Sequence, residues 1–174
     1  MKAFYAEEQK RHDPKAFLSS GAQKPNPEQP ERVERLKAGA IAAGCTVERP
    51  KNHGLGPVSA VHTPEYLDFL EHIFARWQRI EGASEEVIPN IHPIARGGSY
   101  PASAVGQAGY HMADTACPIS AETWDSALWS AWSAVEAAET VLSGQPAAYA
   151  LCRPPGHHAF ADVAGGFCLI NNSA

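Results

Sequence analysis

The segment from residue 122 to residue 152 most constrains the fold of this 174-residue chain. Residues 122–142 carry one apolar stripe at helical spacing, and Gly144 and Pro146 end that pattern. The stripe consists of Trp124, Leu128, Ala131, Val135, Ala138 and Leu142. Residues 147–152 are then apolar on both faces, which is typical of a buried parallel strand. A helix followed by a buried strand predicts an α/β fold, with ligands outside the carboxyl ends of the strands.

The first 50 residues predict two short strands with a helix between them. Residues 3–6 and 46–48 predict the strands, and a helical pattern starts at Pro30 and ends at Gly44. Residues 7–29 are polar and rich in proline, so we expect a loop there.

A second helix and a long loop follow. Thr63 and Pro64 are the residue types preferred at the N-cap and the first position of a helix, and we expect this helix to end at Gly82. Residues 82–120 show little periodicity and contain several Pro and Gly, which predicts a long loop with a short helix near residues 104–116. Long loops in compact domains are usually lids, binding loops or interfaces, with disorder as the alternative.

Composition narrows the class of protein. The formal net charge is −5 and no basic block stands out, so nucleic-acid binding has little support. No apolar run approaches the roughly 20 residues that span a bilayer, and the N-terminus becomes charged too early for a signal peptide. The four cysteines lack zinc-finger spacing, which favours reduced, buried thiols. We therefore expect a cytoplasmic protein that contacts neither nucleic acid nor membrane.

Two adjacent histidines follow the strand expected at residues 147–152. His157 and His158 come directly after a Pro-Pro-Gly sequence at residues 154–156, which favours a turn and can bring both rings to one site. Histidine titrates near a pH of about 6.5, so a positioned pair can accept and donate protons at neutral pH. From the residues alone, exposed turn positions, metal ligands and acid–base groups remain open.

Two segments around this turn resemble the signature of the zinc-dependent deacetylase family, which comprises histone deacetylases, bacterial acetylpolyamine amidohydrolases and acetoin-utilisation proteins. They are Arg-Pro-Pro-Gly-His-His-Ala at residues 153–159 and Gly-Gly-Phe-Cys-Leu-Ile-Asn-Asn at residues 165–172. Residues 30–35 and 61–67 agree with the same family in order and rough spacing. The loop at residues 82–120 resembles the acetylpolyamine amidohydrolase branch more than the histone deacetylases proper.

The resemblance implies that residues 1–174 are the N-terminal portion of a single deacetylase domain, with residues 82–120 as a long loop insertion. The implied fold is a three-layer arginase/deacetylase-like α/β fold with a mainly parallel sheet, here incomplete. The implied activity is Zn²⁺-dependent removal of acetyl groups from small acetylated amines or from acetyl-lysine. A homodimer is also expected, because such a loop can border the tunnel of a partner subunit.

The same resemblance assigns roles to five residues. His157 and His158 would share the general-base and general-acid roles, in an order that is disputed for such sites. Gly166 and Phe167 would line the narrow substrate tunnel, and Arg32 would lie near its inner end. Without this context, Phe167 would be interpreted as a core aromatic and Arg32 as part of a surface ion pair.

The resemblance also predicts what this chain lacks. The family's zinc ligands are two aspartates and a histidine, and the resemblance places them and a catalytic tyrosine after Ala174. We therefore expect no metal ligands within the chain, no activity from this segment alone, and a longer parent enzyme. A naturally short protein that uses the half-fold as a binding or interaction module is the alternative. An arginase-like ureohydrolase shares the fold class but fits the two signature segments less well.

The remaining titratable residues are expected to be structural. His62 resembles a structural position of the family. His12 and His111 have no partner pattern, which predicts either a surface position or a hydrogen-bonded core position. The acids of the long loop are expected to be solvated and match no polyamine-selecting carboxylate clearly; they are Glu85, Glu86 and Asp114.

Overall fold

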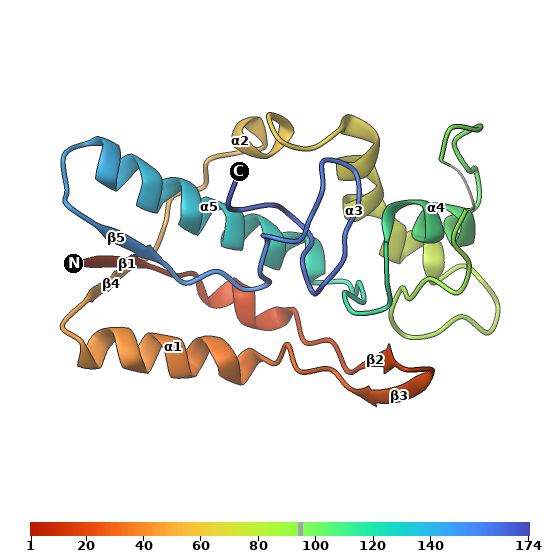
Figure 1. Cartoon of the computed structure of the whole chain (residues 1–174), viewed down its shortest axis with the longest axis horizontal. Coiled ribbons are helices and arrows are strands. Elements are labelled where there is room, and N and C mark those ends of the chain that lie inside the picture. Colours follow the sequence, from red (N-terminus) through yellow and green to blue (C-terminus); the bar gives the residue numbers. More distant parts are fainter. Residues whose placement is uncertain (94–95) are drawn as a thin grey trace.

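Three short parallel strands form the central sheet of the computed structural model, which describes residues 1–93 and 96–174 (Figure 1). They are β1 (Lys2–Phe4), β4 (Thr46–Glu48) and β5 (Ala148–Ala150), in the order β4–β1–β5. In the central strand, Lys2 is in register with Thr46 on one side and with Ala148 on the other. The mainly parallel α/β sheet expected from the sequence is confirmed. β1 begins one residue before the strand expected at residues 3–6 and ends two residues before it.

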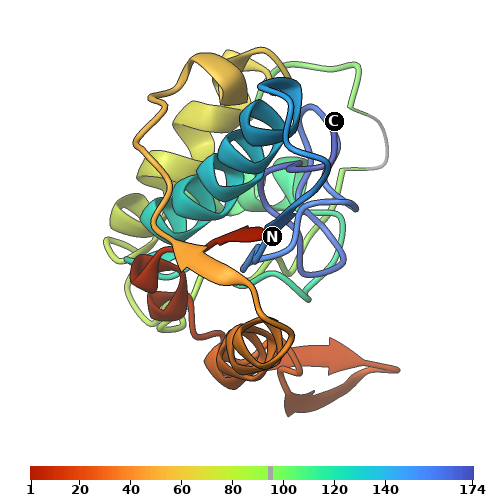
Figure 2. The same cartoon turned by 90° about the vertical axis from the view of Figure 1, so that its left-hand side faces the viewer.

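Helices cover both faces of this sheet. Figure 2 shows the sheet edge-on between two layers, with α1 (Pro30–Ala42) below it and α5 (Thr123–Leu142) above it. α1 contacts β4, whereas α5 contacts β5 and β1. This three-layer arrangement buries Ala3 and Phe4 of the central strand, whereas the three residues of β5 are half-buried.

A larger core lies between α5 and two further helices, α3 and α4 (Ala104–His111). α3 (Pro64–Trp77) begins where the sequence predicts, with Thr63 Oγ1 accepting a hydrogen bond from the backbone N–H of Tyr66. The helix ends at Trp77 rather than at Gly82, which lies in a later turn with a φ of +72°. The buried apolar residues of this core include Tyr66, Phe69, Ile73, Ala108, Leu128, Ala131 and Trp132.

The segment at residues 7–29 is not the loop that its polar composition predicts. It contains a 3₁₀ helix, η1 (Glu7–Arg11), and an antiparallel hairpin of β2 (Ala16–Ser19) and β3 (Ala22–Pro25). Residues 20–21 form the two-residue turn of this hairpin, and both have positive φ, as type I′ turns require. The prediction was wrong because the hairpin is largely exposed, so it lacks the alternation of apolar and polar residues that marks half-buried strands.

The expected long loop packs closely against the core. It contains α4 (Ala104–His111), which is shorter than the predicted helix at residues 104–116, and an isolated bridge between Val87 and Ile119. Both residues of this bridge are buried. A Cβ on Gly109 of α4 would lie 1.8 Å from the carbonyl oxygen of Ile91, so this backbone approach requires glycine. Residues 94 and 95 of the expected loop lie outside the described residues.

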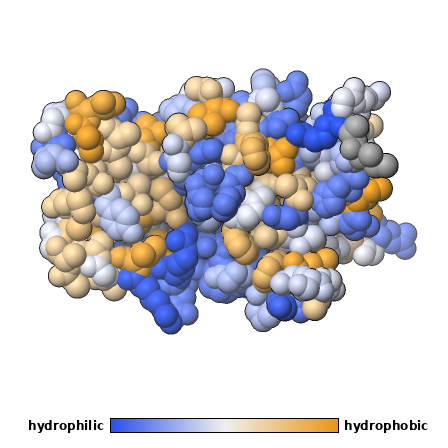
Figure 3. Space-filling model, in the orientation of Figure 1, coloured by the Kyte–Doolittle hydropathy of each residue, from blue (hydrophilic) through white to orange (hydrophobic). Residues whose placement is uncertain are grey.

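The outer side of β5 and α5 is apolar and open. Figure 3 shows apolar residues gathered over the part of the surface where these two elements lie. Leu142 is 86% exposed, and a groove of about 420 Å³ lies between α5, the short helix α2 (Gly56–Ser59) and residues 170–174. Within the described residues, β5 pairs with a strand on one edge only. No helix of the described part of the chain is long and apolar enough to cross a membrane.

His12 joins the end of η1 to the start of α5. Its side chain is buried, and its Nδ1 lies 3.0 Å from Thr123 Oγ1. Burial, together with repulsion from the nearby Arg153 charge, lowers the pKa of His12 to about 3. Of the two positions that the sequence left open for this histidine, the structure shows the hydrogen-bonded core position.

We expect His12 to make the folded protein less stable as the pH falls. The unfolded chain protonates His12 near the ordinary pKa of 6.5 and the folded chain near about 3, so the unfolded state binds more protons between these values. From about pH 7 to about pH 5, this residue should lower the free energy of unfolding by roughly 2 kcal/mol. Denaturant titrations at both pH values measure the change.

The matched variants for this measurement are His12→Gln and His72→Gln. His72 is exposed on α3, so its variant should keep the pH dependence of the original protein. His12→Gln should have a smaller pH dependence, whatever its absolute stability. An equal pH dependence in the two variants would contradict a lowered pKa of His12 in the folded protein.

Candidate active site

The chain that leaves β5 forms a turn at the carboxyl end of the strand, where ligands bind in parallel α/β sheets. After Ala150 it passes through Arg153, which precedes a cis peptide bond, and reaches His157 and His158 in an exposed position. The centroids of the two imidazole rings lie 4.3 Å apart, with an angle of 51° between their planes. The turn therefore brings both titratable rings to one place on the surface.

Gly156 allows this turn to lie against residues 170–172 of the second signature segment. A Cβ at this position would lie 2.3 Å from the carbonyl oxygen of Ile170 and 2.4 Å from Asn172 Oδ1. Only glycine permits such a close approach of backbone to backbone. Gly156, which directly precedes the two histidines, therefore contacts the second signature segment.

His62 and Asn171 hold the same two segments together. The backbone N–H of Asn171 donates to His62 Nε2 at 2.9 Å, and the ring donates from Nδ1 to the carbonyl oxygen of Ala161 at 3.2 Å. Asn171 Nδ2 donates to the carbonyl oxygen of Ala159 at 2.9 Å. Burial lowers the pKa of His62, which favours the neutral ring that this donor–acceptor pattern needs. His62 therefore has a structural position, as expected.

Gly166 and Phe167 occupy a tight two-residue turn. The backbone groups of Gly165 and Cys168 exchange two hydrogen bonds, and the two residues between them have φ values of +56° and +69°. For Phe167 this left-handed conformation costs about 1–3 kcal/mol. A Cβ on Gly166 would lie 2.9 Å from the His158 ring, so this ring packs directly against the turn.

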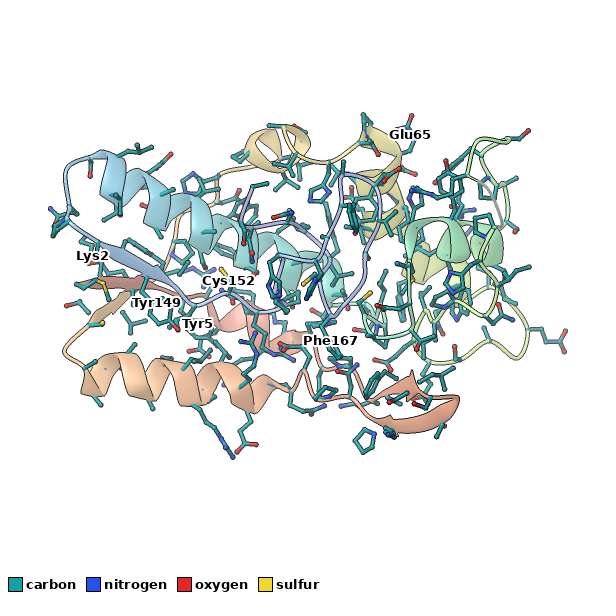
Figure 4. All side chains as sticks on the ribbon, viewed as in Figure 1. Lys2, Tyr5, Glu65, Tyr149, Cys152 and Phe167 are labelled. Carbon is teal, nitrogen blue, oxygen red and sulfur yellow. The ribbon has the colours of Figure 1, made fainter. Side chains whose placement is uncertain are left out.

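Phe167 faces a second aromatic ring that the sequence analysis missed. Figure 4 shows Phe167 on the side of the C-terminal loop that faces the β2–β3 hairpin. The centroid of its ring lies 5.8 Å from that of Phe17 in β2, in an edge-to-face arrangement. No local pattern marks Phe17 as part of the site, because the segment that carries it is polar and the two residues meet only in the folded chain.

Arg32 and Arg153 both contact Glu28, and they differ in burial, because the Arg32 side chain is partly exposed and that of Arg153 is not. Arg32 pairs with Glu28 at 2.8 Å and donates to the carbonyl oxygen of Cys152 at 3.0 Å. The Arg153 side chain is fully buried and forms an ion pair with Glu28 at 3.1 Å. It also donates to the carbonyl oxygens of Gln9 at 2.7 Å and Gln29 at 3.1 Å. The sequence feature that could have revealed the role of Arg153 is its place at the end of an apolar strand, since a charged residue is seldom buried there unless it is paired.

His111 and Arg96 of the long loop contact Asp162, which lies between the two signature segments. His111 donates from Nδ1 to the carbonyl oxygen of Asp162 at 2.8 Å and accepts from the Tyr100 hydroxyl at Nε2, also at 2.8 Å. Arg96 forms an ion pair with the Asp162 carboxylate at 2.8 Å. Burial lowers the pKa of His111. The loop is therefore connected to the segment that follows the two histidines.

The prediction that the loop acids are solvated is wrong for Asp114. Its two carboxylate oxygens accept hydrogen bonds from the backbone N–H groups of Gly166 and Ala116, each at 2.8 Å. Glu86 is half-buried and accepts from the backbone N–H of Lys15, whereas Glu85 is exposed as expected. The sequence could not show this, because a short acid in a loop has the same local pattern whether its partner is water or a distant backbone group.

The residues around the turn do not fit a complete zinc site. Within residues 1–93 and 96–174, the three potential metal ligands that converge are His53, Glu136 and Glu139, which belong to the β4–α2 connection and to α5. Glu136 pairs there with His53 at 2.9 Å and with Lys51 at 3.3 Å, which makes this group an ion-pair network. Zinc needs three or four converging protein ligands, and His157 and His158 alone do not provide them.

The fold and the two signature segments define a deacetylase-type domain. The chain matches the histone deacetylase domain over residues 26–174 and belongs to that family, which confirms the resemblance. It is 43% identical over 175 residues to the acetylpolyamine amidohydrolase of Burkholderia pseudomallei (strain 1710b), covering 100% of this chain and 51% of that relative. It is 39% identical over 176 residues to the acetylpolyamine amidohydrolase of Mycoplana ramosa, with the same two coverages.

A solved structure agrees with these relatives. The crystal structure of an acetylpolyamine aminohydrolase from Burkholderia pseudomallei superposes with a TM-score of 0.95 at 43% identity, over 99% of this chain and 50% of that one. The chain therefore spans about half the length of the curated relatives it matches.

We expect Arg153 to be essential for the stability of the fold around the site. Arg153→Met should lower the free energy of unfolding by about 3–5 kcal/mol. It leaves the carbonyl oxygens of Gln9, Glu28 and Gln29 without their donor, and Arg32 remains as the arginine partner of the buried Glu28 carboxylate. Arg35→Met is the matched control, since Arg35 forms an exposed pair with Glu31 and should cost less than about 0.5 kcal/mol. Urea denaturation of both variants measures the difference, and equal losses would disprove the special role of Arg153.

Proposed function

We propose that the full-length protein is a Zn²⁺-dependent amide hydrolase that removes acetyl groups from small acetylated amines. The observation that carries this proposal is the His157–His158 pair, which lies against the Gly166–Phe167 turn in a chain of the histone deacetylase family. Relatives named acetylpolyamine amidohydrolase favour small acetylated amines, with acetyl-lysine as the nearest other substrate.

In this proposal, the two exposed imidazoles divide the proton transfers of amide hydrolysis. One of His157 and His158 takes a proton from the attacking water, and the other gives a proton to the amine nitrogen as the C–N bond breaks. Acetate and the free amine are the products. The 4.3 Å separation of the ring centroids allows both groups to reach one scissile bond.

Three further residues are proposed to bind the substrate. Phe167 and Gly166 would line the tunnel, because an aromatic wall with no side chain beside it accommodates a narrow methylene stem. Arg32 would lie near the inner end, where Glu28 and the carbonyl oxygen of Cys152 hold its guanidinium. The cofactor proposed is Zn²⁺, a Lewis acid suited to polarising an amide carbonyl. Its ligands would come from a part of the protein outside these 174 residues.

The second candidate function is a binding or interaction module without catalysis. The observation that favours it is that the described residues around the turn do not assemble a ligand set for a metal. For either function we propose a cytoplasmic location, which fits four cysteines that are all free thiols in the structure.

Acetate release from an acetylated diamine and from an acetyl-lysine peptide tests the two candidates. We expect the intact protein to release acetate, to lose this activity with a chelator and to regain it with Zn²⁺. His157→Ala and His158→Ala should each lower kcat by about 10²–10⁴-fold, because each removes a proton-transfer group. His72→Gln, on the exposed side of α3, should keep full activity.

Binding of an acetylated amine without acetate release would support the module instead. Near-normal turnover in both alanine variants would exclude the proposed roles of the two histidines.

We also propose a homodimer formed through residues 82–120. Two large apolar side chains of this segment are exposed, with Ile91 at 58% and Tyr100 at 42%. Ile91→Glu should therefore convert a dimer to a monomer in sedimentation-velocity measurements, because it places a charge in an apolar contact. Ile41→Glu, at an exposed position of α1, should leave the dimer intact. A monomer for the unaltered full-length protein would refute this proposal.

A further inference from the structure

One carboxylate of the long loop holds the Gly166–Phe167 turn. Asp114 is half-buried, and its Oδ2 accepts a hydrogen bond of 2.8 Å from the backbone N–H of Gly166. Its Oδ1 accepts a second bond of 2.8 Å from the backbone N–H of Ala116. One oxygen therefore orders the loop that carries Asp114, and the other holds the turn that presents Phe167.

Backbone contacts bring Asp114 to this position. The N–H of Ala164 donates to the carbonyl oxygen of His111 at 2.7 Å, and the N–H of Ala113 donates to the carbonyl oxygen of Ala164 at 2.8 Å. These bonds form a short parallel bridge between Met112 and Ala164. The Asp114 side chain continues the same row of contacts, at the point where the chain enters the tight turn.

The turn needs such an external contact because its backbone is strained. Gly166 and Phe167 have φ values of +56° and +69°, and a side chain such as that of Phe167 is disfavoured in this region. Strained conformations persist where surrounding contacts over-determine them. A bond to the N–H of Gly166 fixes the peptide plane that enters the turn. It thereby sets the direction of Phe167 and the surface on which the His158 ring packs.

The neighbouring residue holds the opposite aromatic. Thr115 Oγ1 accepts a hydrogen bond of 3.0 Å from the backbone N–H of Leu18 in β2. Leu18 follows Phe17, whose ring meets the Phe167 ring at 5.8 Å. Asp114 and Thr115, which are consecutive in the loop, thus bind the turn that carries Phe167 and the strand that carries Phe17.

We propose that Asp114 is a positioning residue that fixes the Gly166–Phe167 turn and, through it, the His158 ring and the aromatic wall. The inference deepens the proposed function and rests on it for the substrate contacts of these groups. Asp114 acts through backbone hydrogen bonds, so its role differs from that of an acid that attracts a cationic substrate. The role requires an acceptor at both carboxylate oxygens.

Asp114→Asn tests this requirement with almost no change in shape, because an amide presents one oxygen and one NH₂ group. The NH₂ group would face one of the two backbone N–H groups, so one hydrogen bond would be lost, and the other would no longer be made to a charged acceptor. Asp114→Glu is the second variant, since it keeps the charge but displaces both oxygens. Glu85→Gln is the matched control, because Glu85 is an exposed acid of the same loop.

The first measurement observes the Gly166 amide directly and does not depend on activity. Labelling with ¹³C′-glycine and ¹⁵N-glycine selects amides within Gly-Gly pairs, which in this sequence are those of Gly98 and Gly166. In Asp114→Asn, the Gly166 amide should shift upfield and exchange with solvent at least about tenfold faster, because a charge-assisted bond is lost. Gly98 should be unchanged, as should both amides in Glu85→Gln. An unaltered Gly166 amide in Asp114→Asn and Asp114→Glu would overturn the proposal.

The second measurement compares acetylated amines whose far end is either cationic or uncharged. Both Asp114 variants should lose about tenfold or more in kcat/KM, to the same extent for the two substrates, because the turn is displaced for either one. A loss confined to the cationic substrate would make Asp114 a substrate-binding acid and refute the positioning role. If the unaltered protein hydrolyses neither substrate, the proposed function fails, while the Gly166 amide still decides the role of Asp114.

Discussion

A fully buried arginine connects the parts of the chain that meet beneath the candidate active site. The Arg153 guanidinium reaches backbone carbonyls of η1 and of the segment before α1, and it pairs with the buried Glu28 carboxylate. The Arg153 backbone N–H also donates to the Gln9 side chain at 2.7 Å. A buried charge is tolerated only with such partners, because its desolvation costs several kcal/mol. The first signature segment therefore leaves β5 in a direction that these hydrogen bonds define.

The remaining contacts around the site order a strained loop without regular secondary structure. His62 and Asn171 join the two signature segments, and Gly156 lets them approach at backbone distance. On the other side, Asp114 of the long loop holds the second signature segment at Gly166, and His111 holds Asp162 in the connection between the two segments. Backbone strain at Phe167 is consistent with a functional site, since strained residues persist where surrounding structure stabilises them. The long loop is thus part of the framework of the site.

Much of the fold could be predicted from local patterns. The start of α3 at Pro64 and the extent of α5 follow from capping residues and apolar spacing, which act within a few residues of each other. The β2–β3 hairpin could not be predicted this way, because its strands are exposed and polar. The end of α3 was also misplaced, since Gly82 terminates a later turn. Exposed elements and helix ends depend on contacts that leave weak local signals.

The two signature segments were sufficient to identify the family and to single out His157, His158 and Phe167, because their residue types are contiguous in the chain. The folded chain added Phe17, Asp114 and the buried partners of Arg153. Asp114 and Gly166 are 52 residues apart, and Arg153 and Gln9 are 144 apart. Hydrogen bonds over such separations form only when packing brings the segments together, and a single sequence carries no periodic pattern that reports them.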